Sequence, residues 1–207
     1  MKHLYKTAKF ENLNPYVQRV REHPLMSVEA SGVFEHYKNK KCVVDLGCGN
    51  GHFLSQYLEK YPDFVGLGVE RRYKRIFKTQ KKLEALGARG LRSEIEDFVA
   101  MSPENFWDEV WIQFPDPWPK KRHECHRMIR LSLYFHLNRI LKPGGRFCFL
   151  SDHADYWNHL MEVQTSKGLF PMMQSLQGDL FHSEPPSLFK KLFLQKELPL
   201  YSLIFKK

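Results

Sequence analysis

The chain has 207 residues, of which 43% are hydrophobic and 14% aromatic, so it carries enough apolar material for one compact domain, and global disorder is excluded. Its 32 lysines and arginines outnumber its 23 aspartates and glutamates, and the resulting formal charge of +9 favours a polyanionic partner. No apolar run reaches the roughly 18 residues of a membrane-spanning helix, and the opening residues do not resemble a signal peptide, so we expect a cytoplasmic protein without membrane association.

The first forty residues differ from the rest of the chain. They are polar, contain no clear strand pattern and end in a basic stretch at 38–41. We therefore predict an N-terminal basic arm over 1–40, packed on or beside a single domain that spans 41–207. Within that domain, apolar patterns separated by glycine and proline predict strands and helices in alternation.

The predicted elements follow one another in a regular order. Strands are predicted at 42–46, 63–70, 89–93, 108–114, 146–151, 168–174 and 199–205. Helices are predicted at 52–61, 71–86, 95–101, 125–141, 155–166 and 185–198. We expect the helix at 125–141 to stop at Lys142-Pro143-Gly144-Gly145. This order predicts an α/β fold with a doubly wound, mostly parallel seven-stranded sheet.

A doubly wound sheet binds ligands at the carboxyl ends of its strands, where the strand order reverses. The first strand ends in a glycine turn, Asp45-Leu-Gly47-Cys-Gly49-Asn-Gly51, which lacks the GxGxxG spacing of dinucleotide sites. Asp45 would repel a pyrophosphate and attract a ligand that carries an ammonium and a sulfonium group. S-adenosylmethionine carries both, so we predict that Asp45, Gly47 and Gly49 bind it.

Two further acids are expected at the same edge of the sheet. Glu70 ends the second strand, where a carboxylate accepts hydrogen bonds from ribose hydroxyls. Glu94, near the end of the third strand, is placed to take the adenine amino group, with the backbone amide of Ile95 beside it. The neighbouring acids Glu96 and Asp97 remain alternatives to Glu94 for the adenine. A further alternative is that Asp45 caps the turn and that Glu70 pairs with Arg71 or Arg72 on a solvated helix start.

The segment from Phe114 to His123 is the most unusual in the chain. Its three prolines predict a stiff loop, because proline fixes its own φ and restricts the residue before it. Asp116 would stand at the mouth of the crevice, Trp118 offers a face for stacking a base, and Lys120 and Arg122 can bind phosphates. The alternative is a rigid connector with a core tryptophan.

We expect neither a metal site nor a disulfide framework. The three possible ligands His123, Cys125 and His126 are crowded into one short turn, which suits tetrahedral coordination poorly. The cysteines form no CxxC pair and are predicted to be reduced and structural. They are Cys42, Cys48, Cys125 and Cys148.

Four motifs, DLGCGNG, GVE, FPDPWPKKRH and SDHADY, together resemble the single-subunit bacterial tRNA (guanine-N7-)-methyltransferase family from about Lys41 onward. The resemblance implies a Rossmann-like class I S-adenosylmethionine-dependent methyltransferase fold and methyl transfer to N7 of a guanine in tRNA, in the variable loop. Carried over by position, it implies cofactor contacts at Asp45, Glu70, Glu94 and Asp116, with Asp116 also catalytic.

The resemblance also implies substrate contacts at Lys120 and Asp152, and near the C-terminus it expects a Thr-Lys-Phe-Glu-like motif. The matching stretch here is Ser187-Leu188-Phe189-Lys190, which keeps a hydroxyl at Ser187 but lacks both the cation and the carboxylate of the motif. This departure leaves the C-terminal substrate contacts open.

Three other functions remain as alternatives. A methyltransferase of the same fold acting on a protein or a small molecule would keep the cofactor residues. An NAD-dependent dehydrogenase is disfavoured by the glycine spacing and by Asp45. A non-enzymatic RNA-binding protein would explain the charge but would leave the acids at the strand ends without a role. The sequence leaves monomer and homodimer equally open.

Overall fold

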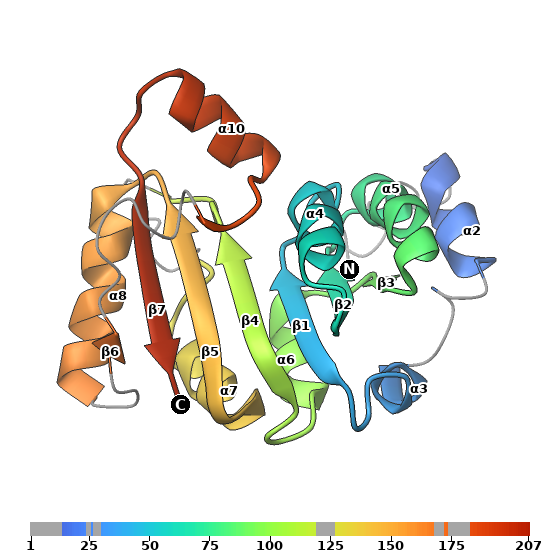
Figure 1. Cartoon of the computed structure of the whole chain (residues 1–207), viewed down its shortest axis with the longest axis horizontal. Coiled ribbons are helices and arrows are strands. Elements are labelled where there is room, and N and C mark those ends of the chain that lie inside the picture. Colours follow the sequence, from blue (N-terminus) through green and yellow to red (C-terminus); the bar gives the residue numbers. More distant parts are fainter. Residues whose placement is uncertain (1–13, 24–25, 27–29, 119–126, 168–171, 174–182) are drawn as a thin grey trace, which may run out of the picture.

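A computed structural model describes residues 14–23, 26, 30–118, 127–167, 172–173 and 183–207. Seven strands form one sheet in the order β3-β2-β1-β4-β5-β7-β6 (Figure 1). The strands are β1 (Lys41–Leu46), β2 (Phe64–Val69), β3 (Arg89–Leu91), β4 (Trp107–Gln113), β5 (Leu141–Ser151), β6 (Met172–Met173) and β7 (Tyr201–Lys206). β1 to β5 are parallel to one another, whereas β7 runs antiparallel between β5 and β6. The predicted doubly wound, mostly parallel sheet is therefore confirmed.

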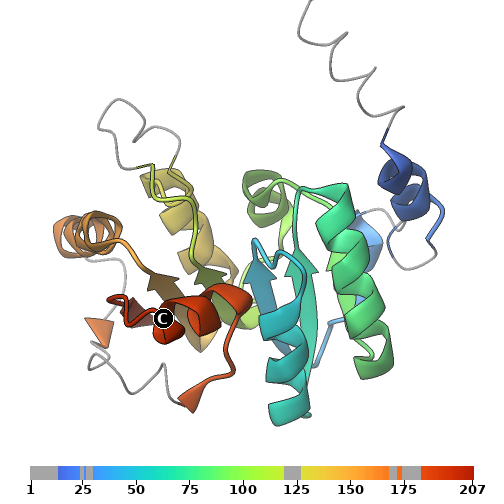
Figure 2. The same ribbon diagram turned by 90° about the horizontal axis from the view of Figure 1, so that it is seen from above.

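Helices cover both faces of the sheet. Figure 2 shows α6 (Ile95–Met101), α7 (Leu131–Ile140) and α8 (Ala154–Lys167) on one face, and α4 (His52–Lys60) and α10 (Leu188–Gln195) on the other. α5 (Tyr73–Leu83), continued by the short 3₁₀ turn η1 (Glu84–Leu86), packs against β2 and β3. β2 is wholly apolar, and β1 and β4 are buried except at Lys41, Asp108 and Gln113, because both faces of the sheet are covered.

The described part of the predicted arm packs on the domain. α2 (Pro15–Arg21) contacts α5, and Asn14 caps it by accepting a hydrogen bond from the Tyr16 amide at 3.0 Å. α3 (Ala30–Glu35) precedes β1. Val33, Phe34 and Tyr37 are buried in the main apolar cluster together with residues of α6, α7 and the sheet. Burial of these side chains stabilises the domain as well as the arm.

The prediction for 125–141 was wrong in its bounds. The helix begins only at Leu131, and the residues from Arg127 to Arg130 are not helical. Lys142-Pro143-Gly144-Gly145 lies inside β5 rather than before it, because Leu141 pairs with Trp107 and Arg146 pairs with Glu109 across a register shift. A bulge of this kind accommodates proline and the left-handed Gly144, whose φ is +80°.

The topology fixes where a ligand can bind. β1 lies between β2 and β4, so the strand order reverses beside β1, and the carboxyl ends of these strands meet at one edge. None of the helices in the described residues is long and apolar enough to cross a bilayer. Cys42, Cys48 and Cys148 are buried free thiols, and Cys125 lies outside the described residues.

Candidate active site

A cavity of about 740 Å³ opens at the carboxyl ends of the central strands. Its size is typical of a site that encloses a small molecule. It brings together the residues after β1, β2, β3 and β4 and the first turn of α10. Most of the predicted site residues that the structure describes line it, namely Asp45, Gly47, Gly49, Glu70, Glu94, Ile95, Asp116, Trp118 and Ser187.

Backbone hydrogen bonds fix the glycine turn to the end of β2. The amides of Gly47 and Cys48 both donate to the Val69 carbonyl, at 2.8 and 3.1 Å, and so join the turn to the end of β2. Gly47, Gly49 and Gly51 all have left-handed φ angles, which side chains rarely adopt. A Cβ at Gly49 would meet nothing within 4 Å, so the backbone there faces open space. A ligand can therefore approach this backbone closely.

Asp45 and Glu70 place two acids beside the turn. Asp45 is only 3% exposed, and its pKa is raised to about 7, first by burial and second by the charge of Glu70. Glu70 accepts a hydrogen bond from the Arg72 amide at 2.9 Å and lies 3.9 Å from the Arg75 guanidinium. The guanidinium beside Glu70 is thus that of Arg75 rather than that of Arg71 or Arg72, and Glu70 is buried and lines the cavity.

Glu94 and Ile95 lie at the start of α6. Glu94 is the N-cap residue, and its side chain makes no capping hydrogen bond. The Ile95 side chain is buried and lies 3.9 Å from the position that a Cβ on Gly47 would take. Glu94 and Ile95 therefore both line a cavity whose wall is partly apolar.

The proline-rich loop follows β4 as predicted. Phe114 and Trp118 have left-handed φ angles of +48° and +43°, on either side of the exposed Asp116. The Phe114 ring packs against Phe193 of α10, with ring centres 5.2 Å apart. Trp118 is 38% exposed and lines the cavity, so the alternative of a core tryptophan is wrong.

α10 forms the far wall. Ser187 caps this helix, with its hydroxyl oxygen accepting from the Lys190 amide at 3.2 Å. Lys190 is 1% exposed, and its ammonium donates to the Glu184 carbonyl at 2.9 Å. Burial lowers the pKa of Lys190 to about 8. The lysine is thus buried behind the wall, which is lined by Leu188, Phe189 and Leu192.

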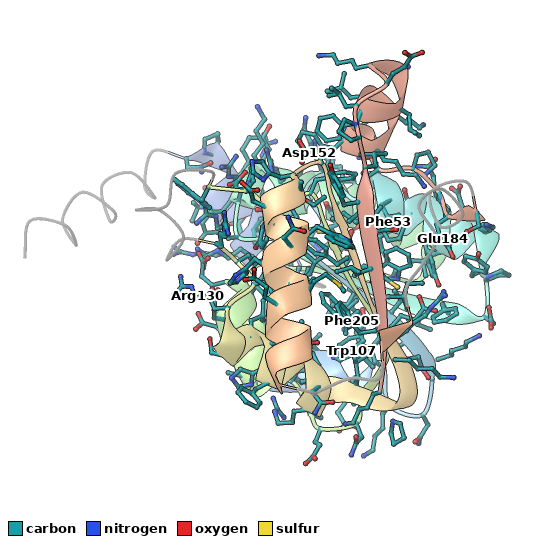
Figure 3. The ribbon with its side chains drawn as sticks, turned by 90° about the vertical axis from the view of Figure 1, so that its left-hand side faces the viewer. Phe53, Trp107, Arg130, Asp152, Glu184 and Phe205 are labelled. Carbon is teal, nitrogen blue, oxygen red and sulfur yellow. The ribbon has the colours of Figure 1, made fainter. Side chains whose placement is uncertain are left out.

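Three predicted substrate residues are not placed in the cavity. Asp152 lies between β5 and α8, at the end of the molecule where α10 lies (Figure 3), but it is not among the described residues that line the cavity. Lys120 and Arg122 lie outside the described residues, as do His123, Cys125 and His126. In the described part of the chain, no group of three or more His, Cys, Asp or Glu side chains is arranged to hold a metal ion.

The cavity also contains residues that the sequence did not single out. Gln113 ends β4, and neither polar atom of its buried carboxamide has a hydrogen-bond partner among the described residues. The sequence feature that could have singled out Gln113 is its position directly before the proline-rich loop. Other such residues line the walls, namely Phe53, Met128 and Arg130.

Comparison with known proteins adds the family. A bifunctional glycosyltransferase/methyltransferase of Fusobacterium nucleatum is 28% identical over 94% of this chain, which spans only 32% of that protein. A tRNA (guanine-N(7)-)-methyltransferase of Lactobacillus acidophilus is 29% identical over 77% of each chain. A solved structure of an antibiotic-related methyltransferase matches with a TM-score of 0.59 and 14% identity, over 87% of this chain and 94% of that one, and so supports the fold.

The Methyltransf_4 family, described as "Putative methyltransferase", matches residues 39–200. This range contains the whole cavity, from the glycine turn to the first turn of α10. The chain therefore belongs to the Methyltransf_4 family of methyltransferases.

Proposed function

We propose that the protein transfers a methyl group from S-adenosylmethionine to N7 of a guanine in tRNA. The observation that carries this proposal is the meeting of three acids from neighbouring strand ends, Asp45, Glu70 and Glu94, with the stiff loop of Asp116 and Trp118 in one cavity. The names of several relatives, among them the Lactobacillus acidophilus protein, support the tRNA substrate. Such a substrate also favours a cytoplasmic location.

The residues of the cavity fit S-adenosylmethionine. Asp45 is a buried acid with a raised pKa, so a ligand with positive charge would stabilise its ionised form. Gly49 leaves room for close backbone approach. Glu70 would accept from the ribose hydroxyls, and Glu94 with the Ile95 amide would hold the adenine. The cofactor supplies a methyl group on a positively charged sulfur.

The protein's own part in catalysis is alignment and electrostatics. N7 of neutral guanine already presents a lone pair, so no general base is required before attack. Asp116, exposed at the cavity rim, would accept hydrogen bonds from the guanine N1–H and amino group and so turn N7 toward the methyl donor. Its negative charge also stabilises the positive charge that the purine gains. Trp118 offers a flat face beside it for stacking.

A cationic surface beside the cavity would bind the tRNA backbone. Arg71, Arg72 and Arg75 line the rim, and α5 continues with exposed lysines. An aromatic ring lies beside these cations, since the Lys74 ammonium sits 5.9 Å from the Tyr16 ring centre. Cations of this kind release counterions from RNA, so binding should weaken steeply with salt.

The test is methyl transfer to unmodified tRNA transcripts with methyl-labelled S-adenosylmethionine, followed by mapping of the modified nucleotide. We expect a single N7-methylguanine. A methylated nucleotide of another kind would overturn the assignment, as would label that enters no tRNA while isothermal calorimetry shows tight cofactor binding. Absence of cofactor binding would remove the methyltransferase proposal itself.

A methyltransferase with a substrate other than tRNA is the second candidate. One observation favours it: the α10 wall presents exposed apolar residues, Leu188 and Phe189, where a polar contact to RNA would be expected. Transfer of label from S-adenosylmethionine to a small-molecule or protein fraction, with tRNA unlabelled, would select this candidate.

A further inference from the structure

The proline-rich loop is tied to α8 by a buried arginine. Arg127 is 5% exposed, and its Nε donates a hydrogen bond to the Pro117 carbonyl at 3.0 Å. Its guanidinium carbon lies 5.5 Å from the ring centre of Tyr156, a residue of α8. The Tyr156 hydroxyl accepts a hydrogen bond from the Ile129 amide at 2.9 Å. Arg127 therefore joins the loop to a helix that packs against the sheet.

The loop needs such support because its backbone is strained. Phe114 and Trp118 both have left-handed φ angles, although neither is glycine. Conformations of this kind persist only when the surrounding structure holds them, and they are frequent at active sites. On one side of Asp116 the Phe114 amide donates to the Leu150 carbonyl at 2.8 Å. On the other side the Arg127 bond to Pro117 holds the chain.

We infer that Arg127 is a positioning residue, which fixes the Pro117 carbonyl and thereby holds Asp116 and Trp118 at the cavity. This inference rests on the proposed function, because it assigns Arg127 to the alignment of the substrate base. Arg127 is not among the described residues that line the cavity, so its effect passes through the loop.

The chemistry of this contact suits arginine. A guanidinium stays charged, stacks on an aromatic ring and donates in its own plane at the same time. A lysine at 127 would keep the charge, but its strongly hydrated ammonium cannot both stack on Tyr156 and donate from a fixed plane. Lysine should therefore restore only part of the function.

A matched control exists elsewhere in the fold. Arg139 of α7 also holds backbone carbonyls, since its guanidinium donates to Val99 at 2.7 Å and to Ala100 at 3.2 Å. It supports α6 and does not line the cavity. Arg139→Ala removes a comparable contact without touching the proline-rich loop, so it reports the effect of lost stability alone.

The experiment compares Arg127→Ala, Arg127→Lys and Arg139→Ala with the unaltered protein. We measure kcat and KM for tRNA, S-adenosylmethionine affinity by calorimetry, and the thermal midpoint. Arg127→Ala should lower kcat by about tenfold to a hundredfold, because misplaced catalytic groups lose alignment, and should leave cofactor affinity within about twofold. Millimolar methylguanidinium should recover part of that kcat. Arg139→Ala should lower the thermal midpoint and keep kcat.

Loop position is read separately from activity by fluorine NMR of protein labelled with fluorotryptophan, in which Trp118→Phe identifies the Trp118 signal. Arg127→Ala should shift or broaden that signal, and Arg139→Ala should not. If Arg127→Ala does not fold, Arg127→Lys gives the same comparison.

Two results would overturn the inference. One is an unchanged kcat together with an unchanged Trp118 signal in the Arg127 variants. The other is a loss of cofactor affinity as large as the loss of kcat, which would indicate general destabilisation. If the unaltered protein methylates no tRNA while the Trp118 signal still depends on Arg127, the proposed function is wrong. Arg127 nevertheless holds the loop in position in that case.

Discussion

Asp45 in β1 and Glu70, directly after β2, hold two carboxyl groups close together at the cavity, where burial and the charge of Glu70 raise the pKa of Asp45 to about 7. A protonated Asp45 cannot attract an ammonium or a sulfonium. With Asp45 as a cofactor residue, as we propose, its ionisation should link cofactor binding to pH near neutrality.

Cofactor affinity should rise with pH through this range. Because the pKa of Asp45 is raised to about 7, its ionised fraction rises several-fold between pH 6 and 7, and S-adenosylmethionine should bind correspondingly more tightly at the higher pH. Isothermal calorimetry between pH 5.5 and 7 measures this, since the ammonium of the ligand stays largely charged there. Asp45→Asn should bind more weakly and show no such dependence.

The stability of the free protein should change in the opposite direction. The pKa of Asp45 is higher in the folded chain than in the unfolded chain, so its contribution to stability is complete at low pH and is lost as pH rises through about 7. The thermal midpoint of the ligand-free protein should therefore fall less between pH 6 and 8 in Asp45→Asn. Equal slopes in both proteins would show that Asp45 is ionised throughout.

Asp116→Asn should reduce turnover far more than cofactor affinity. The asparagine keeps the shape of the side chain but loses the charge that stabilises the methylated purine, and we expect kcat to fall about a hundredfold. Single-turnover assays at saturating S-adenosylmethionine measure the chemical step, and calorimetry measures the cofactor. If cofactor affinity fell as much as kcat, Asp116 would be a cofactor residue rather than an orienting one.

Gly51→Ala should destabilise the protein more than Gly87→Ala. Both glycines have left-handed φ angles, +70° and +64°, so both substitutions cost about 1 kcal/mol of backbone strain. A Cβ at Gly51 would also lie 2.8 Å from Thr79 Cγ2, whereas one at Gly87 would meet nothing within 4 Å. This overlap should add about 1 to 3 kcal/mol in urea unfolding. Equal losses would mean that Thr79 moves aside freely.

Charge reversal on α5 should weaken tRNA binding without affecting the cofactor. Lys74→Glu with Lys78→Glu removes two exposed cations from the proposed RNA surface, and the slope of log affinity against log salt should become shallower by about 1 to 2. Lys38→Glu with Lys40→Glu is the control, because it changes the net charge by the same amount and both residues precede β1, at the edge of the sheet opposite the cavity. Equal effects of the two changes would indicate unspecific attraction by net charge.

Much of the site followed from sequence order alone. Asp45, Glu70 and Glu94 each come at or just beyond the end of a strand with a clear apolar pattern, and the carboxyl ends of parallel strands meet at one edge. The three prolines close to Asp116 in the sequence predicted a stiff loop around it. These features depend on residues close in sequence, so local patterns predict them.

Other features were decided by contacts between distant segments. Arg127 was predicted to be helical, but its bond to Pro117 and its contact with Tyr156 hold it in an irregular segment. Lys190 was expected to stand where a carboxylate would contact substrate, and instead it is buried against Glu184.

The sequence by itself therefore determined the order of strands and helices and the edge at which the acids gather, because those follow from local chain patterns and parallel topology. Only the tertiary structure decided which cation supports the loop around Asp116 and which wall of the cavity is apolar. Side-chain direction at these positions is set by packing between elements far apart in the chain, and no short-range pattern encodes it.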